Sequence, residues 1–138
     1  MSPENTQKLI ESCPRLYPED FYFECENGWF QLLLDLSLQL EAEINFCESP
    51  DIAEPCEIEF RATQVKEKYG TLRFYMTCST DKMQDLIEEA EKKSQYICEH
   101  CSAPGTLTVR HGWWSVSCVE CQLAKRGINI EASLPGVE

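Results

Sequence analysis

Apolar residues recur at three- and four-residue intervals in two stretches of the chain, the spacing of one buried helix face. In residues 28–45 the stripe consists of Trp29, Leu32, Leu33, Leu36, Leu40 and Ile44. In residues 80–97 it consists of Met83, Leu86, Ile87, Ala90 and Ile97. These patterns predict two core helices, the first capped by Asn27 and the second by Thr80 or Asp81. A shorter helix is predicted around Gln7–Cys13, ahead of an irregular segment that runs to residue 27.

The pattern changes to alternation in residues 58–77, where Tyr69 and Gly70 interrupt two runs of strand-forming residues. This arrangement predicts a β-hairpin with a two-residue turn. The preceding residues, 47–57, are rich in proline and acid and are predicted to form a loop.

A second hairpin is predicted around His111 and Gly112, and its register sorts the neighbouring side chains onto two faces. A two-residue turn places Arg110 opposite Trp113 and Val109 opposite Trp114. One face is then apolar and is expected to pack on the rest of the protein: Leu107, Val109, Trp114 and Val116. The other face pairs Trp113 with Arg110, a combination typical of protein-binding hot spots. The alternative is that the C-terminal tail covers Trp113, or that Trp113 stacks on Arg110.

Four of the nine cysteines form two Cys-x2-Cys pairs, Cys98/Cys101 and Cys118/Cys121, with sixteen residues between the pairs. This is the ligand spacing of four-thiolate zinc sites. Four thiolates leave no coordination position for water or substrate, so we expect one structural zinc ion. An iron–sulfur cluster is an alternative for the same four residues, and a redox dithiol would need only one pair.

These elements predict an α+β protein in which a small helix and hairpin core continues directly into a treble-clef or zinc-ribbon-like module. We expect an acidic core at residues 1–97, a four-cysteine module at 98–127 and a tail at 128–138. The remaining cysteines have no common spacing and are expected to behave as small hydrophobic residues: Cys13, Cys25, Cys47, Cys56 and Cys78.

Charge limits the range of functions. The 138 residues contain 24 acidic and 12 basic side chains, a net charge of −12, which opposes a general grip on nucleic-acid phosphates. Residues 1–80 hold 15 of the acids and 6 of the bases. Glu57 and Glu59 are therefore candidate contacts to a basic partner protein.

Other sequence signals concern location and catalysis. The chain has no apolar run long enough to span a bilayer and no signal-peptide pattern, so we expect a cytoplasmic protein that does not bind membranes. Phosphate-binding loops and the common hydrolase and metalloprotease motifs are missing from the sequence, and we do not expect an enzyme.

Four segments together resemble a family of small, mostly uncharacterised bacterial and prophage proteins: GWFQLLLDLSLQLE, QVKEKYGTLRFYM, IEEAEKKSQYICEHCSAPGTL and GWWSVSCVEC. The resemblance covers roughly residues 28–122. Many members of this family end in Cys-x2-His where this chain has Cys121, a change that keeps a closed zinc site. The resemblance implies a phage or mobile-element origin and no particular activity.

Three functions are compatible with these features. The first is stoichiometric binding of a host protein, as in an anti-CRISPR or other anti-defence inhibitor whose acidic part occupies a basic nucleic-acid channel. The second is a zinc-finger regulator that binds nucleic acid through its weakly basic residues: Lys92, Lys93, Arg110, Lys125 and Arg126. The third is a structural or assembly subunit of a phage particle. We expect the first, with no direct contact to nucleic acid.

Overall fold

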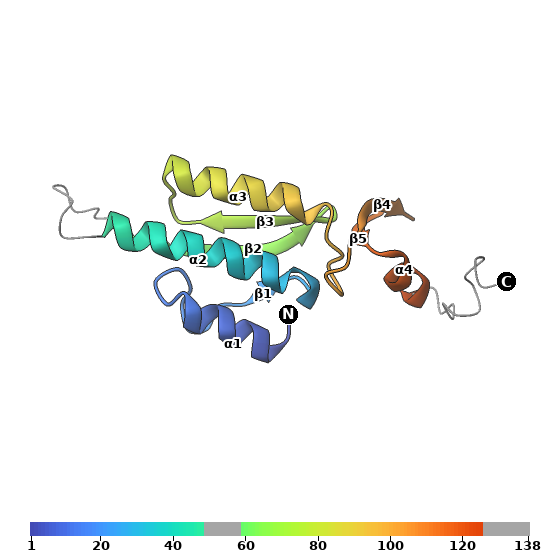
Figure 1. Ribbon diagram of the computed structural model, residues 1–138, viewed down its shortest axis with the longest axis horizontal. Coiled ribbons are helices and arrows are strands. Elements are labelled where there is room, and N and C mark those ends of the chain that lie inside the picture. Colours follow the sequence, from blue (N-terminus) through green and yellow to red (C-terminus); the bar gives the residue numbers. More distant parts are fainter. Residues whose placement is uncertain (49–58, 126–138) are drawn as a thin grey trace.

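The computed structural model describes residues 1–48 and 59–125, and there it confirms the predicted α+β class (Figure 1). Most of the predicted loop at 47–57 and the whole tail at 128–138 lie outside the described residues. A three-stranded sheet has the order β1-β2-β3, and a separate hairpin pairs β4 with β5. The elements in chain order are α1 (Pro3–Ser12), β1 (Phe23–Glu24), the 3-10 helix η1 (Asn27–Trp29), α2 (Phe30–Cys47), β2 (Ala62–Lys68), β3 (Thr71–Met76), α3 (Asp81–Ser94), β4 (Thr106–Arg110), β5 (Trp113–Ser117) and α4 (Val119–Lys125).

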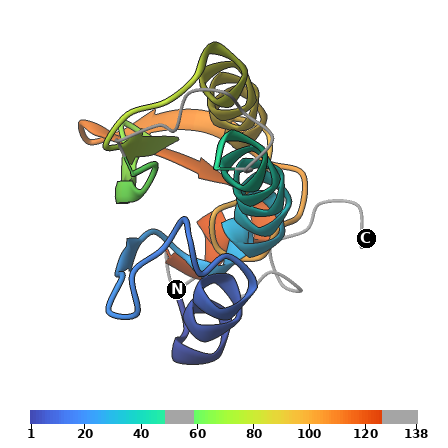
Figure 2. The same ribbon diagram turned by 90° about the vertical axis from the view of Figure 1, so that its left-hand side faces the viewer.

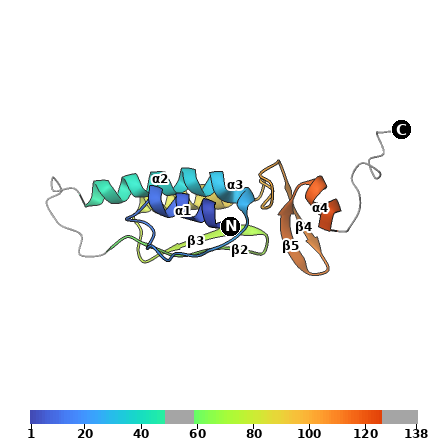
Figure 3. The ribbon, with the colours of Figure 1, turned by 90° about the horizontal axis from the view of Figure 1, so that it is seen from below.

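The core lies between the three long helices and one face of the three-stranded sheet (Figure 3). Seen along the long axis, α2 and α3 lie beside each other with the strands to one side (Figure 2). Both predicted stripes point into this core, although Leu32, Leu86 and Ile97 are only partly buried. The β4–β5 hairpin and α4 lie beyond one end of the core (Figure 1).

The boundaries of the first core helix differ from those predicted. Residues 27–29 form a 3-10 turn, and the α-helix begins only at Phe30. Asn27 does not cap this helix, so that prediction is wrong. Its side-chain oxygen instead accepts hydrogen bonds from the Ser2 backbone N–H at 2.6 Å and from the Asn5 side chain at 3.2 Å, and so ties the start of α1 to the start of α2.

The other two helices also begin or end at different residues from those predicted. Helix α1 begins at Pro3 rather than near Gln7, because Ser2 caps it through the backbone N–H of Asn5. Helix α3 begins as expected with Thr80 as its cap. It ends at Ser94 rather than at residue 97, and the next three residues turn toward the first cysteine pair.

Both predicted two-residue turns are present. Tyr69 and Gly70 have φ of 52° and 83°, and His111 and Gly112 have φ of 51° and 80°. Positive φ at both central residues is the type I′ geometry that matches the twist of a hairpin. The β4–β5 register agrees at every predicted pair, including Arg110 with Trp113 and Val109 with Trp114.

Sequence periodicity did not reveal β1, which pairs in parallel with β2 through Phe23 and Val65. The segment between α1 and β1 is held by a buried carboxylate on α2. The two oxygens of Glu41 accept hydrogen bonds from the backbone N–H groups of Arg15 and Leu16, each at 2.9 Å. A buried backbone donor needs such a partner, so Glu41 fixes the path of this otherwise irregular segment.

The cysteines outside the two pairs lie in different environments. Cys13 and Cys25 are buried, as predicted, and burial raises the pKa of each thiol to about 12. Cys47 and Cys78 are half-buried, and Cys56 lies outside the described residues. The thiols of Cys13 and Cys25 are therefore protonated at neutral pH and are poor nucleophiles.

Replacement of Glu41 by alanine would leave two buried backbone donors without partners. We expect Glu41→Ala to lower the free energy of unfolding by about 3 kcal/mol in urea denaturation. The matched control is Glu43→Ala, which removes only the 2.7 Å ion pair with exposed Lys82 and should lower it by less than about 1 kcal/mol. Equal losses in the two variants would contradict the assigned role of Glu41.

Candidate metal centre

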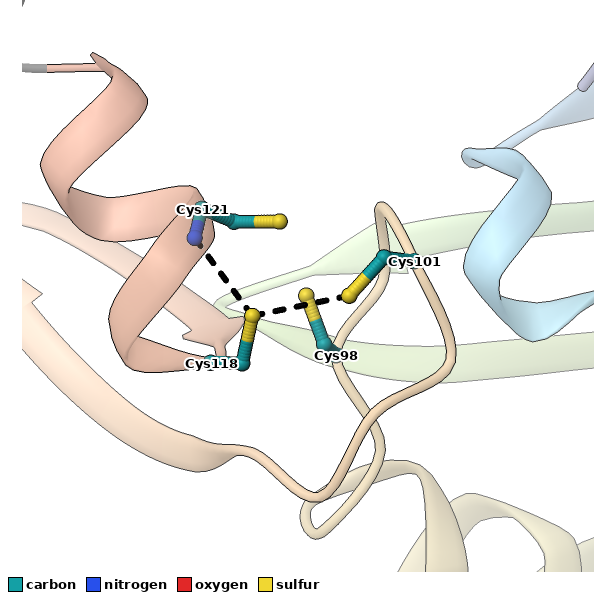
Figure 4. Close-up of side chains that lie close together, drawn as sticks. All are labelled: Cys98, Cys101, Cys118 and Cys121. Atoms are coloured by element: carbon teal, nitrogen blue, oxygen red, sulfur yellow. Dashed lines mark hydrogen bonds between the residues drawn. The ribbon is translucent and has the colours of Figure 1, made fainter. Parts of the chain in front are cut away.

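The two cysteine pairs come together at the end of the core, next to α4 (Figure 4). Cys98 and Cys101 lie on the turn that follows α3, Cys118 directly precedes α4, and Cys121 lies in its first turn. All four sulfur atoms lie within 4.8 Å of one another. The order of turn, hairpin and ligand-bearing helix is that of a treble clef rather than of a zinc ribbon, the other predicted arrangement.

The spacing of the sulfur atoms fits a single metal ion. Metal–sulfur bonds of about 2.3 Å in a tetrahedral site place the sulfurs about 3.8 Å apart. The Sγ atoms of Cys101 and Cys118 are 3.5 Å apart. Cys98 and Cys118 are buried, whereas Cys101 is exposed, so one side of the cluster is open to solvent. These four residues can therefore hold a structural metal ion.

The surroundings of the four thiols favour a bound cation. Burial raises the pKa of the Cys98 thiol, but hydrogen bonds from the backbone N–H groups of Cys118, Cys101 and His100 outweigh burial and lower the pKa to about 7. In contrast, burial and the neighbouring sulfurs raise the pKa of Cys121 well above its usual value. Four sulfurs this close cannot all ionise without a compensating positive charge, which a bound metal ion would supply.

The first cysteine pair is docked onto the core by Gly28 and Trp29. The backbone N–H of Gly28 donates to the carbonyl oxygen of Glu99 at 2.6 Å, and the indole N–H of Trp29 donates to the carbonyl oxygen of Ile97 at 3.0 Å. A Cβ atom on Gly28 would lie 2.2 Å from the carbonyl oxygen of Cys98. Only glycine permits this close approach.

Two polar side chains complete the docking. Ser102 donates to the carbonyl oxygen of Gly28 at 2.7 Å, and the buried carboxylate of Glu99 accepts from the backbone N–H of Glu26 at 3.0 Å. The ligands could be predicted from the sequence, but the roles of Gly28, Glu99 and Ser102 could not. The available signal was the Asn-Gly-Trp sequence ahead of α2, where a glycine is equally compatible with an ordinary helix start.

The hairpin that separates the cysteine pairs is attached to the core at its base and exposed at its tip. At the base, Val116 is buried, and the Leu107 side chain lies against Gly70 in the β2–β3 turn. Toward the tip, Val109 is 52% exposed and Trp114 is 43% exposed. The prediction that the whole apolar face packs on the protein is therefore wrong for these two residues, because the core ends below the tip.

Three of the four residues predicted to contact a partner lie within the described residues. Trp113 is 77% exposed and lies directly opposite the exposed Arg110. Glu59 is also exposed, but its carboxylate forms a 3.1 Å ion pair with Arg61. Glu57 lies outside the described residues. Trp113 and Arg110 are thus the predicted contacts that the structure leaves accessible together.

Comparison with protein families, curated proteins and solved structures found no match to this chain. The resemblance to bacterial and prophage proteins therefore stays a prediction.

Within residues 1–48 and 59–125, the helices are either too short or too polar to cross a membrane.

The contact at Gly28 can be tested by adding one methyl group. We expect Gly28→Ala to lower the free energy of unfolding by about 3 kcal/mol, because a Cβ atom would force the cysteine turn away from the core. It should also release metal at a lower chelator concentration than the unmodified chain. Urea denaturation and chelator competition measure the two effects.

The matched control is Gly112→Ala. Gly112 has φ of 80° but nothing within 4 Å of its Cβ position, so its replacement adds only backbone strain of about 1 kcal/mol. If Gly28→Ala holds its metal as tightly as Gly112→Ala, docking on the core does not support the metal centre.

Proposed function

We propose that the four cysteines bind one structural zinc ion and that the protein acts by stoichiometric binding of another protein rather than by catalysis. The observation that carries the proposal is Trp113, 77% exposed on a hairpin that joins two pairs of metal ligands. Tryptophan is costly to leave in water and is enriched at the centres of protein interfaces.

Zinc is the proposed metal because four thiolates and a closed tetrahedral set suit it, and because it needs no redox chemistry from the protein. The ion would keep the hairpin and α4 together, since these segments bury few apolar side chains of their own. An iron–sulfur cluster would use the same ligands, and elemental analysis distinguishes the two.

The hairpin offers the features of an interface centre. Arg110 lies opposite Trp113, and Trp114 and Val109 leave further apolar surface at the same tip. The β4–β5 pairing and the bound ion would hold these side chains on a rigid support, which limits the entropy lost on binding.

The partner we propose is a basic, nucleic-acid-binding host protein in the host cytoplasm, and the action is interference with a defence complex in the manner of an anti-CRISPR protein. Charge supports this choice: residues 1–48 carry ten acidic side chains and two basic ones. Such a surface is complementary to a channel built for phosphates and speeds association with it.

The metal assignment predicts about one zinc per chain in protein purified without added metal. Cys118→Ser should abolish tight zinc binding and destabilise the hairpin, whereas Cys78→Ser should retain one zinc, because Cys78 lies outside the cluster. Elemental analysis checks both variants. Iron with inorganic sulfide in place of zinc would contradict the assignment.

The binding function can be tested by capture of partners from host lysate on tagged, zinc-loaded protein after nuclease treatment. We expect one host protein at near one-to-one stoichiometry. Trp113→Ala should weaken its binding at least about tenfold, as expected for a hot-spot residue.

The control for this test is Tyr96→Ala, which removes an aromatic side chain of similar exposure, 69%, on the segment before the cysteine turn. It should leave binding unchanged. Recovery of the chain alone, with no host protein retained, would favour a phage structural subunit and contradict the proposal.

A further inference from the structure

Among residues 1–48 and 59–125, no helix covers one face of the three-stranded sheet. Figure 3 shows the three long helices on the opposite face. Val65, Leu72 and Phe74 point into the core and are buried. Alternation along the strands and the register of the sheet therefore place a second set of side chains on the uncovered face: Glu24, Gln64, Lys66, Lys68, Thr71, Arg73 and Tyr75.

Three of these side chains are cations. Lys66 lies directly opposite Arg73 in the β2–β3 register, and Lys68 follows on the same face. Within residues 1–48 and 59–125, none of the three forms an ion pair within 4.0 Å. Like charges directly opposite each other destabilise a sheet, and this pair persists in a chain with twice as many acids as bases.

Several acidic side chains around these cations accept hydrogen bonds from neutral donors. Glu24 lies beside Lys66 in the β1–β2 register and accepts from the Gln64 side chain at 2.8 Å. Glu67 accepts from the backbone N–H of Gly70 at 2.6 Å, and Glu91 accepts from that of Phe74 at 3.0 Å. These neutral donors leave each carboxylate charged, so by register the uncovered face carries three cations and one carboxylate, Glu24.

Exposed aromatic rings accompany the cations. Tyr75 is 41% exposed, and Tyr69 is 65% exposed with the Lys68 ammonium 5.8 Å from its ring centre. A hollow of about 460 Å³ at the β3 edge, next to α3, is lined by Lys68, Tyr69, Arg73 and Tyr75 together with Gln84, Ile87 and Glu91 of α3.

We propose that this uncovered sheet face binds single-stranded nucleic acid. Lys66, Lys68 and Arg73 would contact phosphates, and the rings of Tyr69 and Tyr75 would stack with unpaired bases. A duplex hides its base faces and cannot use these rings. An acidic peptide could neutralise the cations but would gain less from the tyrosines, so the pairing of rings with cations favours nucleic acid.

The net charge of −12 opposes a general grip on phosphates but permits a local site, because the charge is unevenly distributed. The ten acids and two bases of residues 1–48 lie mainly on α1, α2 and the segment between them, whereas residues 59–125 carry nine of each sign. Sheet binding is independent of the proposed protein binding, and a complex that carries a single strand could be contacted through both surfaces.

The test uses fluorescein-labelled 15-nucleotide dT and rU strands with the zinc-loaded full chain in fluorescence anisotropy at 50 mM salt. We expect saturable binding that weakens with salt at a log–log slope of roughly −2, since each of three phosphate contacts contributes about −0.7. No binding of either strand would overturn the inference, whatever the outcome of the partner capture.

The decisive variant is Lys66→Glu, which replaces one of the three cations by a carboxylate. It should weaken strand binding at least fivefold. Lys8→Glu on α1 makes the same change in net charge away from the sheet and should leave binding within twofold.

Stacking is tested separately by Tyr75→Ser against Tyr96→Ser, which removes an exposed ring outside the sheet face. Only the first should weaken binding, by at least threefold. Equal affinity for a 15-base-pair duplex, or full displacement by polyglutamate together with no effect of Tyr75→Ser, would overturn the assignment to single strands.

Discussion

The close contact between Gly28 and the turn at Cys98 and Glu99 joins the two parts of this protein. It brings together the start of α2, the chain after α3 and, through the Glu99 backbone N–H and the Val116 carbonyl oxygen, strand β5. The backbone of Gly28 lies so close to the backbone of Cys98 and Glu99 that no Cβ atom fits between them, so the junction is made by backbone groups. The metal ligands are thus held from the core side by backbone hydrogen bonds and from the other side by the hairpin and α4, so core and metal centre form one folded unit.

Much of this arrangement could be predicted from sequence because the features involved are local. Helix stripes follow the 3.6-residue period, the turns at Tyr69-Gly70 and His111-Gly112 depend on two residues each, and the ligand pairs depend on a two-residue gap. Each pattern can be read within about twenty residues. The fold class, the β4–β5 register and the four clustered cysteines were therefore predicted correctly.

The features that were missed depend on residues far apart in the chain. Strand β1 has only two residues and pairs with a strand about forty positions later, so alternation could not reveal it. Asn27 is a residue type that often caps helices, but its side chain accepts a hydrogen bond from Ser2 at the start of α1 instead. Glu41 has the residue type of a surface position, and its buried role depends on the distant segment at Arg15 and Leu16. The exposure of Val109 and Trp114 depends on how far the core extends along the hairpin. The local sequence around these residues carries no information on that extent.

The Gly28 junction also has a consequence for the order in which the chain matures. The hydrogen bonds from Glu26 to Glu99 and from Ser102 to Gly28 connect residues 73 and 74 positions apart. During synthesis the residues of α1, α2 and the β2–β3 hairpin emerge before any cysteine ligand, so the core collapses first with its Gly28 end uncovered. The last two cysteines of the cluster, Cys118 and Cys121, are made after the core, so a metal ion held by all four cysteines would be enclosed only once the hairpin and α4 have been added to a formed core.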